Sequence, residues 1–228
     1  MLPDVDPDLA IASITLAIRQ RLQAALNRVG SLGGEVRTER PDKLTDTGAP
    51  IVNLYLYQLN LNPFMRNNDL DPVIVRTPDT SGGYKIPATS IQTYRVPLKL
   101  RYMLSFFGDE RTLVPQRLLA VCVAALHRLP QIDARAIGAA AGLVRGSTTA
   151  GSPPPEPLPD FDDVNLSFAD LTLDDTYRLW SAFKATYALS VGYLADTAII
   201  YSAPEPTEVS LVEELELTAA AVRPLPDL

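Results

Sequence analysis

The side chains that could do covalent chemistry are few, because the 228-residue chain holds one histidine and one cysteine. Cys122 and His127 occur in the stretch RLLAVCVAALHRLP, and a thiol beside an imidazole could act as a nucleophile and its base. Residues five apart on a helix do not share a face, however. The spacing therefore favours structural roles for both, with His127 near the negative end of a helix dipole.

The acidic run DFDDVN, at residues 160–165, could supply the oxygen ligands that calcium requires. In a calcium loop starting at Asp160, Asp162 fits the ligand pattern. Val164 and Leu171 stand where a further ligand and the bidentate glutamate belong, and Asn165 stands at the position of the bending glycine. We expect this run to be a solvated loop.

No GxSxG, HExxH or CxxC sequence is present, and the glycines at 30–34 and 81–84 match neither a dinucleotide fingerprint nor a phosphate loop. The sequence predicts no catalytic, cofactor-binding or metal-binding residues, and so no enzyme. The one cysteine excludes an intrachain disulfide and fits a reducing compartment.

The charge balance argues against nucleic acid or an anionic membrane as a partner, because 27 acids outnumber 20 bases and leave a net charge of −7. After Pro204 six acids face the single base Arg223, so a net charge of five negative lies in the tail. No positively charged start is followed by an apolar core, and no apolar stretch is long enough for a membrane span. We expect synthesis in the cytoplasm without direct membrane insertion.

Four helices are predicted from apolar spacing. The first covers residues 8–29, with these residues at three- and four-residue steps: Ile11, Ile14, Ile18, Leu22, Leu26 and Val29. The second covers 112–128, with these residues on one face: Leu113, Gln116, Leu119, Val123 and Leu126. Residues 136–141 could add a short turn of helix. Residues 173–185 form the last, and Asp174 and Asp175 suit its N-terminus.

Four strands are predicted as well. Residues 51–61 are apolar on both faces, which is typical of a central strand covered on both sides. Residues 94–107 alternate, so that Arg95, Lys99 and Arg101 lie on a wet or partner-facing side, and Pro97 indicates a start at a sheet edge or a bulge. A short strand or loop is expected at 164–171 and a last strand at 187–201, whereas 72–92 is predicted to be loop.

This order of elements predicts an α+β fold with a mixed, largely antiparallel sheet flanked by helices. We expect one body over residues 1–203, with a flexible proline-rich loop at 146–160. Residues 204–228 are expected to form an acidic C-terminal arm.

Four stretches carry a resemblance to a known family. They are APIVNLYLYQLNLNPFMRNND (49–69), VPLKLRYMLSFFGDE (96–110), RLLAVCVAALHRLP (117–130) and DDTYRLWSAFKATYALSVGYLADTAII (174–200). In this order they resemble the cap, or tail-terminator, proteins of extracellular contractile injection systems of the antifeeding-prophage and virulence-cassette type. The resemblance covers residues 1–202. Phe183, and the pair Phe106–Phe107, depart from the family pattern.

The resemblance implies a phage tail-terminator-like fold and a structural role. It implies a homo-oligomeric ring, expected to be a hexamer, on the distal end of the sheath and inner tube, where it stops polymerisation and fixes length. Sheath and inner-tube subunits would be its partners, and a paralogous second cap protein is left open. Assembly would take place in the bacterial cytoplasm, with the particle either released or tethered to a membrane.

Two groups of residues are candidates for protein interfaces. Arg66, Asn67 and Asn68 form either a surface turn satisfied by its own hydrogen bonds or a contact between subunits. In the tail four apolar residues alternate with polar ones, as in a strand that adds to a sheet edge: Val209, Leu211, Leu215 and Leu217. A short terminal helix or a disordered acidic tail is the alternative.

Two other functions remain open from the sequence. The chain could instead be a tube or baseplate adaptor subunit of the same machine. The tyrosine-rich strand at 51–61 and Trp180 could also form the platform of a monomeric ligand-binding module.

Overall fold

A computed structural model describes residues 7–44, 48–64, 77–78, 84–85, 89–92, 95–146, 161–201 and 205–208. These residues fall into two compact units. The larger unit holds a six-stranded sheet and four α-helices, and the smaller holds two two-stranded pairs. No helix in the described part of the chain combines the length and the apolar character that crossing a membrane requires.

The sheet of the larger unit runs in the order β1-β2-β6-β9-β8-β7. Its strands are β1 (Glu35–Arg37), β2 (Ile51–Leu61), β6 (Arg95–Phe107), β7 (Gln131–Ile132), β8 (Val164–Ala169) and β9 (Leu189–Tyr201). Only β1 and β2 are parallel, and every other pair is antiparallel. The predicted α+β class with a largely antiparallel sheet is confirmed.

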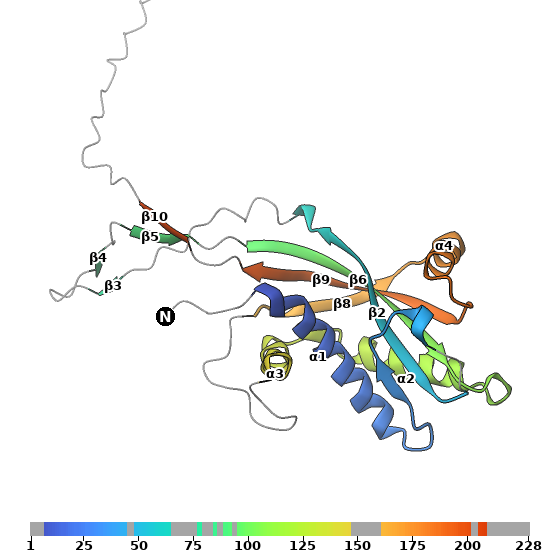
Figure 1. Cartoon of the computed structure of the whole chain (residues 1–228). Helices are drawn as coiled ribbons and strands as arrows, with labels where there is room; N and C mark the ends of the chain where they lie inside the picture. The colour runs from blue at the N-terminus through green and yellow to red at the C-terminus, as the bar shows by residue number, and fades with distance from the viewer. Residues whose placement is uncertain are drawn as a thin grey trace, which may run out of the picture. The chain divides into compact units, whose positions relative to one another are not determined.

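Three helices cover one face of this sheet (Figure 1): α1 (Pro7–Arg28), α2 (Val114–Arg128) and α3 (Ala134–Arg145). Ile14, Ile18, Leu22 and Leu26 are buried along one stripe of α1, as the three- and four-residue spacing predicts. The sheet meets them with every second residue of β6, of which Leu100 is an example. This alternation places the main core between the sheet and α1–α3.

A buried hydrogen bond joins the two layers. The hydroxyls of Tyr102, on β6, and Thr15, on α1, lie 2.8 Å apart, and Thr15 also donates to the backbone oxygen of Ile11. Burial raises the pKa of Tyr102, and the hydrogen bond to Thr15 partly opposes that shift. The only polar atom of the Tyr102 side chain therefore has a partner, as a buried hydroxyl requires.

The opposite face of the sheet is covered by α4 (Leu173–Phe183) at one end (Figure 1). Under α4 the sheet is buried on both faces, and Met103 and Ser105 of β6 are fully covered. Further along the same face Lys99 and Arg101 are only partly buried. The face is thus dry at one end and wet at the other.

The strand β2 has the predicted extent, but it is not covered on both faces along its whole length. Residues 51–54 are buried on both faces, whereas 58–61 are exposed. Its outer neighbour β1 pairs only with Ile51, Val52 and Asn53. A register shift between Leu56 and Gln58 also moves Gln58 to the other face of the sheet.

Two predictions about β6 have different outcomes. The strand lies between β2 and β9, but its ladder with β2 ends at Leu98, so residues 95–97 pair with β9 alone and the expected start at an edge holds for Pro97. A register shift lies nearby, between Leu98 and Leu100, but its extra residue is on β9 and Pro97 itself pairs in register with Ile199, so no bulge is found at Pro97.

The predicted face of α2 is wrong. Leu113 precedes the helix in the left-handed conformation and is exposed, and Gln116 is exposed as well. Leu126 is buried as predicted, but the other buried residues are Pro115, Leu118 and Cys122. The helix α3 is longer than the predicted 136–141, because Asp133 caps its N-terminus and Gly146 ends it at a φ of 73°.

The smaller unit contains β3 (Thr77–Pro78) paired with β4 (Tyr84–Lys85), and β5 (Thr89–Gln92) paired with β10 (Glu205–Glu208). Both pairs are antiparallel. The prediction that residues 72–92 are loop is therefore wrong for these short strands. All but the first residue of the proline-rich stretch 146–160 lie outside the described residues.

Candidate assembly surface

The helix α4 begins at a capping arrangement that its sequence, TLDD, supplies. The Thr172 hydroxyl accepts a hydrogen bond from the backbone N–H of Asp175 at 3.1 Å and donates to the Asp175 carboxylate at 2.7 Å. One turn on, Arg178 pairs with Asp174 at 2.8 Å. Both carboxylates are therefore engaged in starting the helix, as predicted for this pair.

Aromatic rings fasten α4 to the sheet. The ring of Phe183 stands edge-on to that of Tyr55, on β2, with centroids 5.3 Å apart. Trp180 is edge-on to Phe183 at 6.4 Å and contacts Tyr187 at 6.0 Å. Edge-on aromatic pairs at these distances attract one another beyond their burial of area. A continuous row of rings thus runs from β2 to the segment that follows α4.

The outward side of α4 keeps large apolar side chains in solvent. Leu173 is 86% exposed, Tyr177 is 71% exposed and Tyr187 is 60% exposed. Leu173, Tyr177 and Trp180 recur at positions i, i+4 and i+7, so they lie along one stripe of the helix. With Tyr187 they line a hollow of about 500 Å³, and these four residues are called the α4 surface below.

Trp180 forms the floor of the α4 surface and is 3% exposed. Its Nε1–H has no hydrogen-bond acceptor among the described residues. A buried donor without a partner costs about 1–3 kcal/mol. Tryptophan and tyrosine are also the residues most enriched at the energetic centre of protein interfaces. The α4 surface has the composition of a subunit contact.

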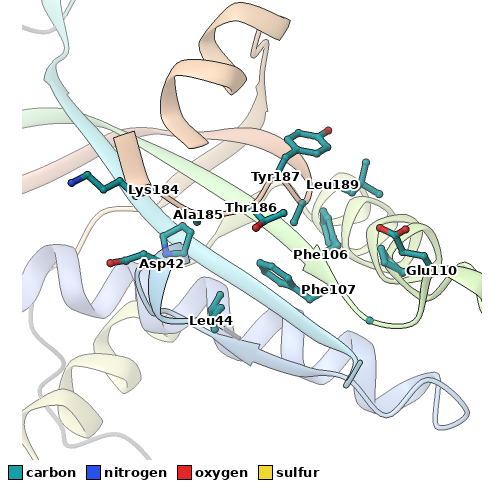
Figure 2. Close-up of a pocket in the computed structure, with 14 residues that line it drawn as sticks. Asp42, Leu44, Phe106, Phe107, Glu110, Lys184, Ala185, Thr186, Tyr187 and Leu189 are labelled. Carbon is teal, nitrogen blue, oxygen red and sulfur yellow. The ribbon is translucent and has the colours of Figure 1, made fainter. Parts of the chain in front are cut away.

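A second hollow of about 520 Å³ adjoins the first, and Tyr187 and Lys184 line both. Figure 2 shows Phe106 and Phe107, from the end of β6, beneath Tyr187 and Leu189. Asp42 and Lys184 lie on one side of these rings, and Glu110 lies on the other (Figure 2). The hollow thus offers an apolar floor with charges of both signs around it.

The three predicted cations of β6 have different surroundings. Arg95 is the first residue of the strand and pairs with Tyr201. Lys99 is occupied within the chain, because its Nζ lies 3.7 Å from the Asp196 carboxylate and 5.3 Å from the centre of the Phe64 ring. Arg101 lines a hollow of about 600 Å³ into which Asp170 also faces.

The other predicted interface residues lie outside the described part of the chain. They are Arg66, Asn67, Asn68, Val209, Leu211, Leu215 and Leu217. Their roles stay predictions. The four residues before Val209 form β10, which pairs with β5 of the same chain.

The α4 surface is not among the interface residues expected from the sequence. Trp180 is expected there only as part of a possible ligand platform. The spacing of Leu173 and Tyr177 marks a helical stripe, but it does not tell whether that stripe faces the sheet or the solvent.

The cysteine, the histidine and the acidic run that could have done chemistry do not form a reactive site in the described part of the chain. Cys122 is fully buried and burial raises the pKa of its thiol to about 12, whereas His127 is exposed. Asp163 accepts hydrogen bonds from Gln131 and the backbone of Ala134, which ties β7 to α3. In the part of the chain that the structure describes, no three His, Cys, Asp or Glu side chains gather as metal ligands would.

Tyr193 packs in the core and against Phe168, with ring centroids 4.7 Å apart. Burial raises the pKa of Tyr193 to about 12, and Cys122 adds to that shift. Both groups therefore keep their protons at neutral pH.

A family model described as the Pvc16 N-terminal domain matches residues 13–214 of the chain, which is more than half of its length. No curated protein sequence matches the chain.

Two structures solved by cryo-EM are similar. One is the sheath/tube terminator of PVC, an extracellular contractile injection system, in its extended state, with 15% identity, a TM-score of 0.49, and 93% of this chain and 65% of that chain covered. The other is the tube-terminating cap of the anti-feeding prophage, with 15% identity, a TM-score of 0.53, and 90% and 60% covered. The likeness to the anti-feeding prophage cap shows a shared fold. The chain spans less than two thirds of the length of either cap chain.

Proposed function

Because the chain belongs to the Pvc16 N-terminal domain family, we propose that it is a structural terminator of a phage-tail-like contractile injection system. Several copies form a ring, expected to be a hexamer, at the distal end of the inner tube and sheath. The ring occupies the surface to which the next tube and sheath subunits would add. Polymerisation stops there, and the particle acquires a defined length.

The observation that carries this proposal is the family match, which extends over nearly all of the described secondary structure, from within α1 to β10. The fold shared with the anti-feeding prophage cap supports it. The anti-feeding prophage chain is a tube-terminating cap. Tube and sheath subunits are the partners that we propose for the present chain by extension.

The α4 surface supports the proposal physically. A ring closes through a heterologous interface, in which one patch of a subunit meets a different patch of the next. Leu173 and Tyr177 present an apolar patch for which the described part of the chain offers no cover. Large exposed apolar patches mark sites of protein association. We assign the α4 surface to a contact with a neighbouring subunit of the particle.

Within the terminator, residues 1–203 would form the body and residues 204–228 an acidic C-terminal arm. The arm follows β9 directly and contains β10.

The experiment compares particles assembled with and without this chain, by electron microscopy of negatively stained samples. With the chain we expect a narrow distribution of sheath lengths and a labelled copy at the distal end. Without it we expect tubes and sheaths of variable length. A label at the baseplate end would favour an adaptor, and unchanged lengths in its absence would contradict the terminator role.

A further inference from the structure

The helical layer carries a charge opposite to that of the whole chain. The helices α1, α2 and α3 contain seven arginines and one acid, a net charge of six positive, although the chain has a net charge of −7. The arginines are Arg19, Arg21, Arg28, Arg117, Arg128, Arg135 and Arg145, and the acid is Asp8. Such segregation creates a local positive potential on a protein that is acidic overall.

A groove of about 510 Å³ lies between α1 and α2 within this layer, and is called the α1–α2 groove below. Small side chains line it, including Ala24 on α1 and Ala124 on α2. Arg28 and Arg128 lie at the ends of these helices and also line the groove. An elongated apolar segment with flanking acids would therefore find both a floor and counter-charges there.

The arginines of the groove differ in how they are engaged. Arg21 donates to the backbone oxygens of Leu129 and Gln131, at 2.6 and 2.7 Å, and so fixes the end of α2 against α1. Burial lowers the pKa of Arg21, and the Asp133 carboxylate partly opposes that shift, so Asp133 is the acidic neighbour of the groove. Arg28 and Arg128 are exposed and form no ion pair with any described residue.

The chain itself contains a segment of complementary chemistry. Residues 209–217, VSLVEELEL, include three glutamates and no base. Its apolar residues are Val209, Leu211, Val212, Leu215 and Leu217. These could cover the alanine floor while the glutamates meet Arg28 and Arg128. A nucleic acid would also be attracted to the arginines but would gain nothing from an apolar floor, and the net charge of −7 would repel it.

We propose that the α1–α2 groove binds the acidic segment 209–217 of a second copy of this chain. The contact joins two different patches of identical chains, so it is heterologous, and repeated contacts of this kind close into a ring. The inference rests on the ring proposed above and names one contact within it. Oppositely charged patches also increase the rate at which copies meet in the correct orientation.

The test uses two variants of the full chain that differ in size through a tag. One carries Ala24→Cys in the groove, and the other carries Leu215→Cys in the segment. The native Cys122 is buried and does not compete for disulfide formation. After mild oxidation of the mixture at low salt, we expect a disulfide-linked heterodimer of the two sizes on a non-reducing gel.

Charge reversal establishes what holds the two chains together. Arg28→Glu with Arg128→Glu should reduce the yield of the heterodimer about tenfold, because two charge pairs become repulsive. The matched control is Arg117→Glu with Arg135→Glu, which makes the same change of charge on α2 and α3 outside the groove and should leave the yield unchanged. Adding Glu213→Lys and Glu214→Lys to the segment should restore the link to the reversed groove.

Three results would overturn the inference. The first is that no heterodimer forms, and the second is that its yield does not change when the charges of Arg28 and Arg128 are reversed. The third uses a chain that carries both Ala24→Cys and Leu215→Cys, and is a disulfide that forms only within that chain and never between two chains. If particles require this chain for uniform length but accept the Arg28→Glu, Arg128→Glu variant without change, the terminator function stands and this contact does not.

Discussion

The two faces of the six-stranded sheet use apolar side chains differently. On the α1–α3 face these side chains are sealed in the core, and the outer surface of the helices carries arginines and alanines. On the α4 face the helix is fastened by Phe183 and Trp180, yet it leaves Leu173 and Tyr177 in solvent. The difference indicates that the first face determines the stability of the fold, whereas the second retains apolar surface for association.

The largest effect on stability should come from the sealed face. Leu100 is fully buried on β6, and Leu100→Ala should lower the free energy of unfolding by about 2–5 kcal/mol, because it leaves a cavity. Its cross-strand neighbour Leu59 is 43% exposed and offers a matched control. Leu59→Ala should cost less than about 1 kcal/mol. Equal losses in urea denaturation would contradict the placement of Leu100 in the sealed core.

A smaller loss is expected where β9 passes beneath the segment leading to α4. A Cβ on Gly192 would lie 2.6 Å from the backbone oxygen of Ala169 and 2.8 Å from Leu171 Cγ. Gly192→Ala should therefore cost about 1–3 kcal/mol through overpacking. Gly30→Ala is the control, because no atom lies within 4 Å of its added Cβ. If Gly192→Ala left the free energy of unfolding nearly unchanged, the segment that leads to α4 would have to move aside at little cost, contrary to this prediction.

A still smaller effect should appear with pH. The folded-state pKa of Cys122 is about 12, above the value of about 8.5 for an unfolded thiol. The folded state therefore holds its proton more tightly, and this contribution is complete below pH 8.5 and is lost as the pH rises toward 12. At pH 9.5 the loss should be about 1 kcal/mol. Cys122→Ala should flatten the dependence between pH 8 and 9.5, and an unchanged slope would contradict the assignment.

The smallest effect on stability should come from the α4 surface. Tyr177 is 71% exposed, so Tyr177→Ala should change the free energy of unfolding by less than about 0.5 kcal/mol. Its incorporation into particles should nevertheless fall, because large exposed aromatic residues often anchor interfaces. Val144→Ala, at an exposed apolar position on α3, is the control. If Tyr177→Ala strongly lowered the free energy of unfolding but entered particles normally, the α4 surface would serve stability and not association, which contradicts the prediction.

The sequence predicts the long elements because their side-chain periods are strong. The stripe of α1 and the extents of β2, β6 and β9 follow from spacing alone. The face of α2 does not, because Leu113 is apolar but adopts a left-handed conformation before the helix begins. Nor does the second half of β2, because the register shift after Leu56 leaves no mark on the alternation of residue types.

The candidate surface was less predictable than the fold. The spacing of Leu173, Tyr177 and Trp180 marks a helical stripe, but an outward apolar stripe and an inward one look alike in sequence. Only the packing of Phe183 on Tyr55 reveals which side of α4 faces the sheet. The positive charge of the helical layer was not predicted either, because the net charge of −7 for the whole chain does not show that seven arginines lie on three helices.

The most direct test of the central claim measures sheath lengths of particles assembled with a Leu173→Ala, Tyr177→Ala chain. The comparison is with the unaltered chain and the Val144→Ala control, each shown to be folded by circular dichroism. We predict that the double variant yields a broad distribution that includes overlong sheaths, whereas both comparison chains yield one narrow length. Narrow, normal lengths with the double variant would contradict the assignment of the α4 surface to termination.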